Sequence, residues 1–164
     1  MTHPQGKNGH PQPRKTARIL LPLLVAACIA FIIFNSSQSG AASGQVSQQV
    51  TAWVSGDAEV PAGTGLETLI RKAGHVAEYA LLGLLLHLCL WAYRRLTATW
   101  CIAAVCFAHL VAILDECYQL TVPGRSGRIS DVFIDTAGAL LGMALGAAVL
   151  RVITLLHRRQ PPHM

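Results

Sequence analysis

The chain has 164 residues, of which 52% are hydrophobic and only 13% are charged. A soluble domain carries roughly twice that charged share, so the composition excludes an ordinary soluble protein. The net charge of +5 does not indicate nucleic-acid binding, because most Lys and Arg residues flank long apolar runs. We therefore expect an all-α integral membrane protein in which the basic residues report topology.

Four apolar runs are long enough to cross a bilayer, although the first is near the lower limit of about 17 residues. The predicted spans are about residues 18–34, 75–93, 100–118 and 132–151. Residues 1–16 are polar and contain several prolines, and are predicted to form a disordered basic cytoplasmic tail. Residues 156–164 are predicted to be a second basic tail. One four-helix membrane domain is therefore expected over residues 17–155.

The first run contains Val25-Ala26-Ala27-Cys28, which resembles a lipoprotein processing box. The apolar run continues after Cys28, where a processed lipoprotein normally turns polar, so we expect an uncleaved helix. The segment after this run, residues 35–70, is rich in Ser, Gln, Gly and Ala. We predict that it is external and contains one short interfacial helix near Ser47–Val54.

Basic residues mark the same side of all four spans. They are Arg14, Lys15 and Arg18 before the first span, Arg94 and Arg95 after the second, and Arg151, Arg158 and Arg159 after the fourth. By the positive-inside rule, these segments and both termini are cytoplasmic. The sequence thus predicts a four-transmembrane-helix bundle, N-in and C-in, in the bacterial cytoplasmic membrane.

The acidic residues mark the opposite side, since all eight carboxylates lie between Asp57 and Asp135. Ionisable groups at membrane depth are costly and usually persist for a functional reason. Helical spacing brings the polar residues of each span to one face. We predict a ligand-binding pocket at the extracytoplasmic end, lined by Lys72, His75, Glu78, Tyr79, Asp115, Glu116, Gln119, Arg125, Arg128, Asp131 and Asp135. Asp135 is its deepest predicted member.

A purely structural role for these residues is the main alternative. Their charges would then form a salt-bridge network that joins three helix ends, and Asp131 would also suit the positive end of a helix dipole. Burying ion pairs for stability alone is inefficient compared with apolar packing, which favours a binding site. The chain lacks HExxH and DxD spacings, so we expect neither a metal nor another cofactor, although a divalent metal would find several acids here.

Small residues on the fourth predicted span form a ladder of Gly138, Gly142 and Gly146 below Asp135. Such a ladder permits close approach of another helix. It would serve a contact within the chain or a homodimer equally well. Because the ladder shares its face with Asp135, that carboxylate is predicted to point into the bundle. His87 and His109 lie within spans, and we expect each to form an interior hydrogen bond.

The same polar segments carry a resemblance to a known family. They are Asn35-Ser36-Ser37-Gln38, residues 71–79, residues 114–119, Pro123-Gly124-Arg125 and residues 131–138. Over about residues 18–150 the chain resembles the VanZ-like membrane proteins, whose pattern favours His where this chain has Tyr118. The resemblance implies a bacterial multi-pass membrane protein. The family's namesake is associated with low-level resistance to the lipid-tailed glycopeptide teicoplanin, and no reaction is implied.

Three functional hypotheses follow from these residues. In the first, the outer-leaflet pocket binds a lipid headgroup, a lipid-linked cell-wall precursor or an amphiphilic glycopeptide-type antibiotic, and thereby affects glycopeptide susceptibility. In the second, the protein is an enzyme that modifies such a headgroup, with His75 as base and Glu78 or Asp115 orienting it. In the third, the protein is a structural or partner-binding subunit. None of them involves nucleic acid.

Overall fold

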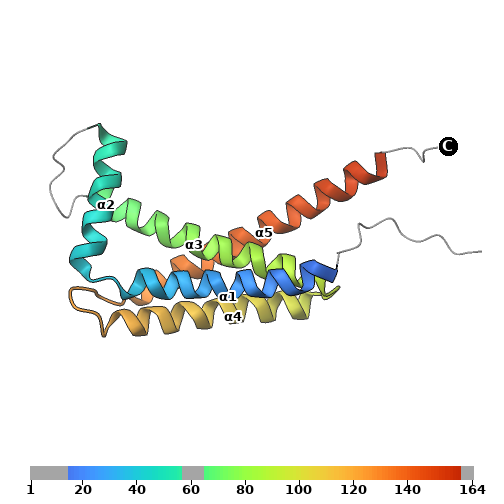
Figure 1. The fold of residues 1–164 in the computed structure, drawn as a ribbon, viewed down its shortest axis with the longest axis horizontal. Coiled ribbons are helices and arrows are strands. Elements are labelled where there is room, and N and C mark those ends of the chain that lie inside the picture. Colours follow the sequence, from blue (N-terminus) through green and yellow to red (C-terminus); the bar gives the residue numbers. More distant parts are fainter. Residues whose placement is uncertain (1–14, 57–64, 160–164) are drawn as a thin grey trace, which may run out of the picture.

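The computed structural model describes residues 15–56 and 65–159 and shows a bundle of helices over them, without strands (Figure 1). The helices are α1 (Lys15–Ser37), α2 (Gly40–Ser55), α3 (Gly65–Ala92), α4 (Ala98–Gln119) and α5 (Ile129–Arg159). Four of them, α1, α3, α4 and α5, are long and apolar enough to cross a membrane. The predicted all-α bundle of four membrane-spanning helices is confirmed, and the N-in and C-in orientation stays a prediction.

The helices extend beyond the apolar runs from which the spans were predicted. α3 begins at Gly65, ten residues before the predicted start, and α5 continues to Arg159. At a rise of about 1.5 Å per residue, α5 is roughly 46 Å long, well above the hydrocarbon thickness of a bilayer. Hydropathy marks only the part of a helix that lies in lipid, which explains the difference. Most of the two predicted tails, together with Asp57 and Glu59, lies outside the described residues.

α2 is the predicted interfacial helix, but it begins at Gly40 and is twice as long as expected. The Ser39 side chain caps its first turn by accepting a hydrogen bond from the amide of Ala42 at 3.2 Å. Gly56 ends it in the left-handed conformation, with φ 75°. Figure 1 shows α2 running across one end of the bundle rather than along it. α2 therefore covers the end of the bundle at which the acidic residues of α3, α4 and α5 gather.

α3 and α5 form the most extensive contact in the bundle, and glycines allow it. A Cβ at Gly142 would collide with the backbone of Ala80, and one at Gly138 would come within 2.8 Å of the Val76 carbonyl oxygen. A Cβ at Gly146 would come within 3.0 Å of the His87 side chain. The glycine ladder is therefore covered by α3 of the same chain. A homodimer through these glycines stays a prediction, and it would have to displace α3.

The basic end of the bundle is joined by contacts between the start of α1 and the end of α3. The guanidinium Nε of Arg18 donates to the carbonyl oxygen of Ala92 at 3.0 Å. The hydroxyl of Tyr93 donates to the carbonyl oxygen of Arg18 at 2.7 Å. In Figure 1 this end lies opposite α2, so the sorting of charge in the sequence becomes a separation of the two ends in space.

Candidate functional site

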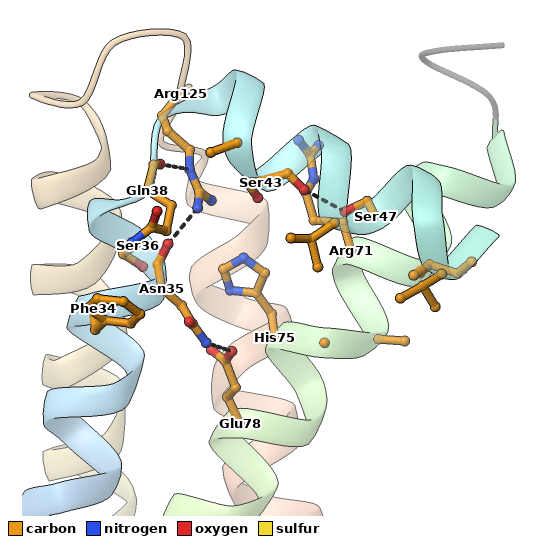
Figure 2. A pocket seen from close by; sticks show the side chains of 16 residues that line it. Phe34, Asn35, Ser36, Gln38, Ser43, Ser47, Arg71, His75, Glu78 and Arg125 are labelled. Atoms are coloured by element: carbon orange, nitrogen blue, oxygen red, sulfur yellow. Dashed lines mark hydrogen bonds between the residues drawn. The ribbon is translucent and has the colours of Figure 1, made fainter. Parts of the chain in front are cut away.

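A groove of about 720 Å³ opens between α1, α2 and α3 at the α2 end of the bundle (Figure 2). Its charged lining comes from α3 and the loop between α4 and α5, and its apolar lining comes from α1, α2 and α3. The lining residues used below are Phe34, Asn35, Val46, Val50, Arg71, His75, Glu78 and Arg125. Figure 2 shows the imidazole of His75 between Arg125 and Glu78. Of the predicted site residues, only His75, Glu78 and Arg125 line this groove.

Arg125 fixes one wall of the groove. Its Nε donates to the carbonyl oxygen of Gln38 at 3.0 Å, and one of its terminal nitrogens donates to the carbonyl oxygen of Asn35 at 2.7 Å (Figure 2). These carbonyls lie where α1 ends and α2 is about to begin, and the carbonyl of Asn35 also accepts from the backbone N–H of Gln38 at 3.3 Å. Arg125 therefore closes the α1–α2 junction and still has guanidinium N–H groups left for the groove.

Two arginines converge on this groove. Burial lowers the pKa of Arg125. The positive charge of Arg71 lowers that pKa further. Arginine nevertheless remains protonated in proteins. Arg71 makes no ion pair within 4.0 Å among the described residues. Glu78 in the same groove and the buried Asp115 and Glu116 act on Arg125 from a longer distance, so the groove holds two arginines without a direct ion pair among the described residues.

Glu78 lies at the bottom of the groove and is hydrogen-bonded to α1. Its Oε1 accepts a hydrogen bond from the side-chain amide of Asn35 at 2.6 Å (Figure 2). The bond links the predicted residue Glu78 to a residue that sequence reasoning missed as part of the site. The signals for Asn35 were its place at the polar end of an apolar run and its segment's part in the family resemblance.

Behind His75, three buried carboxylates come together from two other helices. Asp115 and Glu116 lie at the end of α4 and are 3% and 5% exposed, and Asp135 lies on α5 with no exposed surface. The Nδ1 atom of His75 is 3.6 Å from Oδ1 of Asp135. Helical spacing within one span did not reveal this cluster, because its four residues come from three helices.

The nearby lysine pairs with a fourth acid, outside this cluster. Lys72 pairs with Asp131, at 4.0 Å. Within the described part of the chain, none of the three buried carboxylates has a Lys or Arg side-chain nitrogen within 4.0 Å. The side chains of Arg125 and Arg128 thus make no ion pair with these three carboxylates. Arginine is held here by backbone carbonyls, and the buried acids face histidine and each other.

Backbone and amide groups hold two of these acids. Oε2 of Glu116 accepts from the backbone N–H of Arg128 at 2.7 Å. The amide of Gln119 donates to Oδ2 of Asp115 and to the hydroxyl of Ser36, both at 3.2 Å. The predicted residue Arg128 thus takes part through its backbone, and its side chain is exposed. Gln119 joins the cluster as predicted.

Tyr79 was predicted to line the site, but its fully buried hydroxyl has no hydrogen-bond partner among the described residues. A buried hydroxyl without a partner costs free energy. We expect Tyr79→Phe to raise the free energy of unfolding by about 1 kcal/mol. Titration of the purified protein with sodium dodecyl sulfate measures this change. A loss of stability would show instead that the hydroxyl is bonded in the folded protein.

The two interior histidines differ. Nδ1 of His109 lies 2.8 Å from the hydroxyl of Thr136, which confirms its predicted interior hydrogen bond. His87 is buried against Gly146, and its Nδ1 has no partner in the described residues, so the same prediction is wrong for this atom. Tyr118, which stands where the resemblance favours His, is 42% exposed. Neither His87 nor Tyr118 belongs to the cluster.

Comparison with known proteins agrees with the resemblance carried by these segments. The family model VanZ/LLP1 matches residues 21–151, which include α1 to α4 almost entirely and most of α5. No curated protein and no solved structure matches the chain significantly. Because the matched region covers most of the chain, this multi-pass helical protein belongs to the VanZ/LLP1 family.

Proposed function

We propose that the protein binds the anionic headgroup of a membrane lipid or lipid-linked precursor in the groove between α1, α2 and α3. The observation that carries the proposal is the convergence of Arg71 and Arg125 on one groove, with no carboxylate oxygen of the described residues within 4.0 Å of either side chain. Arginine binds phosphate and carboxylate groups through its planar fork of N–H donors. His75 adds a further ring nitrogen to the same wall.

The apolar part of the groove suits the tail of such a ligand. Val46 and Val50 on α2 stand one helical turn apart, and Phe34 ends the apolar face of α1. Val46 and Phe34 are each 61% exposed. α2 carries no charged residue along its whole length, so it adds no charge to the groove. A headgroup at the arginines would thus have its tail directed along apolar surface.

The side of the membrane follows from charge. The groove lies at the end of the bundle opposite the contacts of Arg18 and Tyr93, and the positive-inside rule assigns that basic end to the cytoplasm. We therefore place the groove at the outer leaflet of the bacterial cytoplasmic membrane. Binding a lipid-linked cell-wall precursor there would affect glycopeptide susceptibility. The enzyme alternative, with His75 as base, stays a prediction.

Dioctanoyl phosphatidic acid tests this proposal, with dioctanoyl phosphatidylcholine as the neutral probe. We expect the purified protein to bind the anionic lipid more tightly, because the arginines contact its phosphate. Arg71→Ala should weaken that binding by about 10-fold, which corresponds to one lost hydrogen bond to a charged group. Native mass spectrometry or tryptophan fluorescence provides the measurement.

Arg128→Ala is the matched control, since it removes the same charge from the same end of the bundle but outside the groove. The affinity of the Arg128→Ala variant for dioctanoyl phosphatidic acid should stay within about 2-fold of wild type, as expected for the loss of an exposed and screened charge. Equal weakening by both substitutions would show that net charge, rather than the groove, attracts the lipid. Equal binding of both lipids by the wild type would contradict the proposal.

A further inference from the structure

We propose that His75, Asp115, Glu116 and Asp135 form a binding site for a divalent transition-metal ion, with Mn²⁺ as its best probe. One ligand atom from each of these residues lies within 4.8 Å of the other three. The proposal departs from the expectation of no metal, which rested on sequence spacing alone. It stands on different residues from the headgroup proposal, except for His75, and does not depend on it.

Three helices converge to make this cluster. His75 projects from α3, Asp115 and Glu116 from the last turns of α4, and Asp135 from the second turn of α5. The close packing of α3 on α5 at Gly138 brings the His75 and Asp135 turns together. Metal–ligand bonds of about 2.0–2.2 Å place neighbouring ligand atoms about 3 Å apart. Small side-chain rotations would therefore bring these four atoms into one coordination sphere.

Asp135 supplies the independent evidence for a ligand. Its side chain has no exposed surface, and neither of its oxygens has a hydrogen-bond partner among the described residues. Oδ1 of the buried Asp115 also lacks a partner, as does Nδ1 of His75. Buried carboxylates without partners are costly, and no Lys or Arg side-chain nitrogen lies within 4.0 Å of these two in the described part of the chain. A divalent cation would satisfy all of these atoms at once.

The donor types select the class of metal. Three carboxylates favour hard cations such as Mg²⁺, Ca²⁺ and Mn²⁺, whereas imidazole favours Zn²⁺, Fe²⁺ and related ions. Mn²⁺ and Zn²⁺ therefore fit this mixed set better than Mg²⁺ or Ca²⁺, and Mn²⁺ also accepts an oxygen-rich site. His75 lines the groove as well, so the metal would lie at the boundary between the groove and the bundle interior.

The surrounding residues orient the carboxylates as in other metal sites. The amide of Gln119 holds Oδ2 of Asp115, and the backbone N–H of Arg128 holds Oε2 of Glu116. Each of these bonds fixes a carboxylate by one oxygen and leaves the other free. Such outer hydrogen bonds position metal ligands and raise affinity.

Mn²⁺ binding to the purified, chelator-treated full chain tests the site, with electron paramagnetic resonance as the readout and no lipid probe added. We expect one Mn²⁺ per chain in the wild type and binding at least about 100-fold weaker in Asp135→Asn, since loss of a ligand exceeds the loss of an outer partner. Asp131→Asn is the matched control. Asp131 lies one turn away on α5 and pairs with Lys72 outside the proposed ligand set, so this variant loses only a nearby charge and should bind Mn²⁺ far more tightly than Asp135→Asn.

His75 should give a spectroscopic signature of metal ligation, which a purely structural role of this residue would not give. Electron spin echo modulation should show coupling of Mn²⁺ to a ring nitrogen in the wild type, and His75→Gln should remove it. Because Asp135→Asn and His75→Gln are close in size to the native residues, their melting curves serve as the check on folding. Equal Mn²⁺ binding by wild type and a folded Asp135→Asn, or no nitrogen coupling in the wild type, would overturn the proposal. Neither result bears on lipid binding by Arg71.

Discussion

Gly142→Leu is expected to lower the free energy of unfolding by about 3 kcal/mol, because overpacking a tight contact forces the backbone to move. A Cβ at Gly142 would collide with the carbonyl group of Ala80 and come within 2.8 Å of the amide nitrogen of Leu84. These are backbone atoms of α3, which cannot rotate away as a side chain does. α3 and α5 would have to separate, and the cluster at His75 and Asp135 would separate with them. Unfolding in sodium dodecyl sulfate measures the change.

Gly74→Leu on α3 is the control for this prediction. Nothing lies within 4 Å of a Cβ at Gly74, so a side chain there meets open space. Its unfolding free energy should stay within about 1 kcal/mol of wild type, with a gain from the better helix propensity of leucine. If Gly142→Leu left the unfolding free energy unchanged and dissociated a homodimer, the glycine ladder would act between chains instead.

Sequence patterns were sufficient to predict the four membrane-spanning helices, because each pattern lies within one continuous segment of the chain. Long apolar runs predicted four spans, and the same charge sorting that separates the ends in the sequence separates them in the structure. The bounds were less accurate, since the helices continue as polar turns beyond the lipid-facing run, as at the start of α3. Ser39 and Gly56 are residue types that mark the start and the end of a helix, and they bound α2.

The site was harder to predict because it depends on contacts between helices. The face shared by Lys72, His75 and Glu78 was identified correctly as polar, but the structure sends these side chains to different surroundings. Lys72 meets Asp131, His75 meets the buried acids, and Glu78 meets Asn35. No spacing within one helix encodes which neighbour a residue meets. Arg71 was not among the predicted site residues, although Glu67 and His75 stand one helical turn before and after it.

Arg125→Ala is expected to lower the free energy of unfolding by about 3 kcal/mol, as two hydrogen bonds from a charged group are lost. The guanidinium joins the carbonyls of Asn35 and Gln38 at the α1–α2 junction, and both would be left without this donor. Arg125→Lys should recover about half of the loss, because an ammonium lacks the planar fork that reaches both carbonyls. The same unfolding titration measures both variants.

Arg128→Ala separates this role from a general effect of charge. Its side chain is exposed and makes no hydrogen bond or ion pair in the described part of the chain, and its backbone N–H, which holds Glu116, is retained. Its stability should therefore stay within about 0.5 kcal/mol of wild type. If Arg125→Ala were equally mild, other contacts would hold the junction, such as the hydrogen bond from the Gly40 N–H to the Pro123 carbonyl oxygen at 3.1 Å, and Arg125 would be free to act only on a ligand. If Arg125→Ala is destabilising as expected, Arg71 becomes the better residue for testing binding, since it lines the same groove without holding the fold.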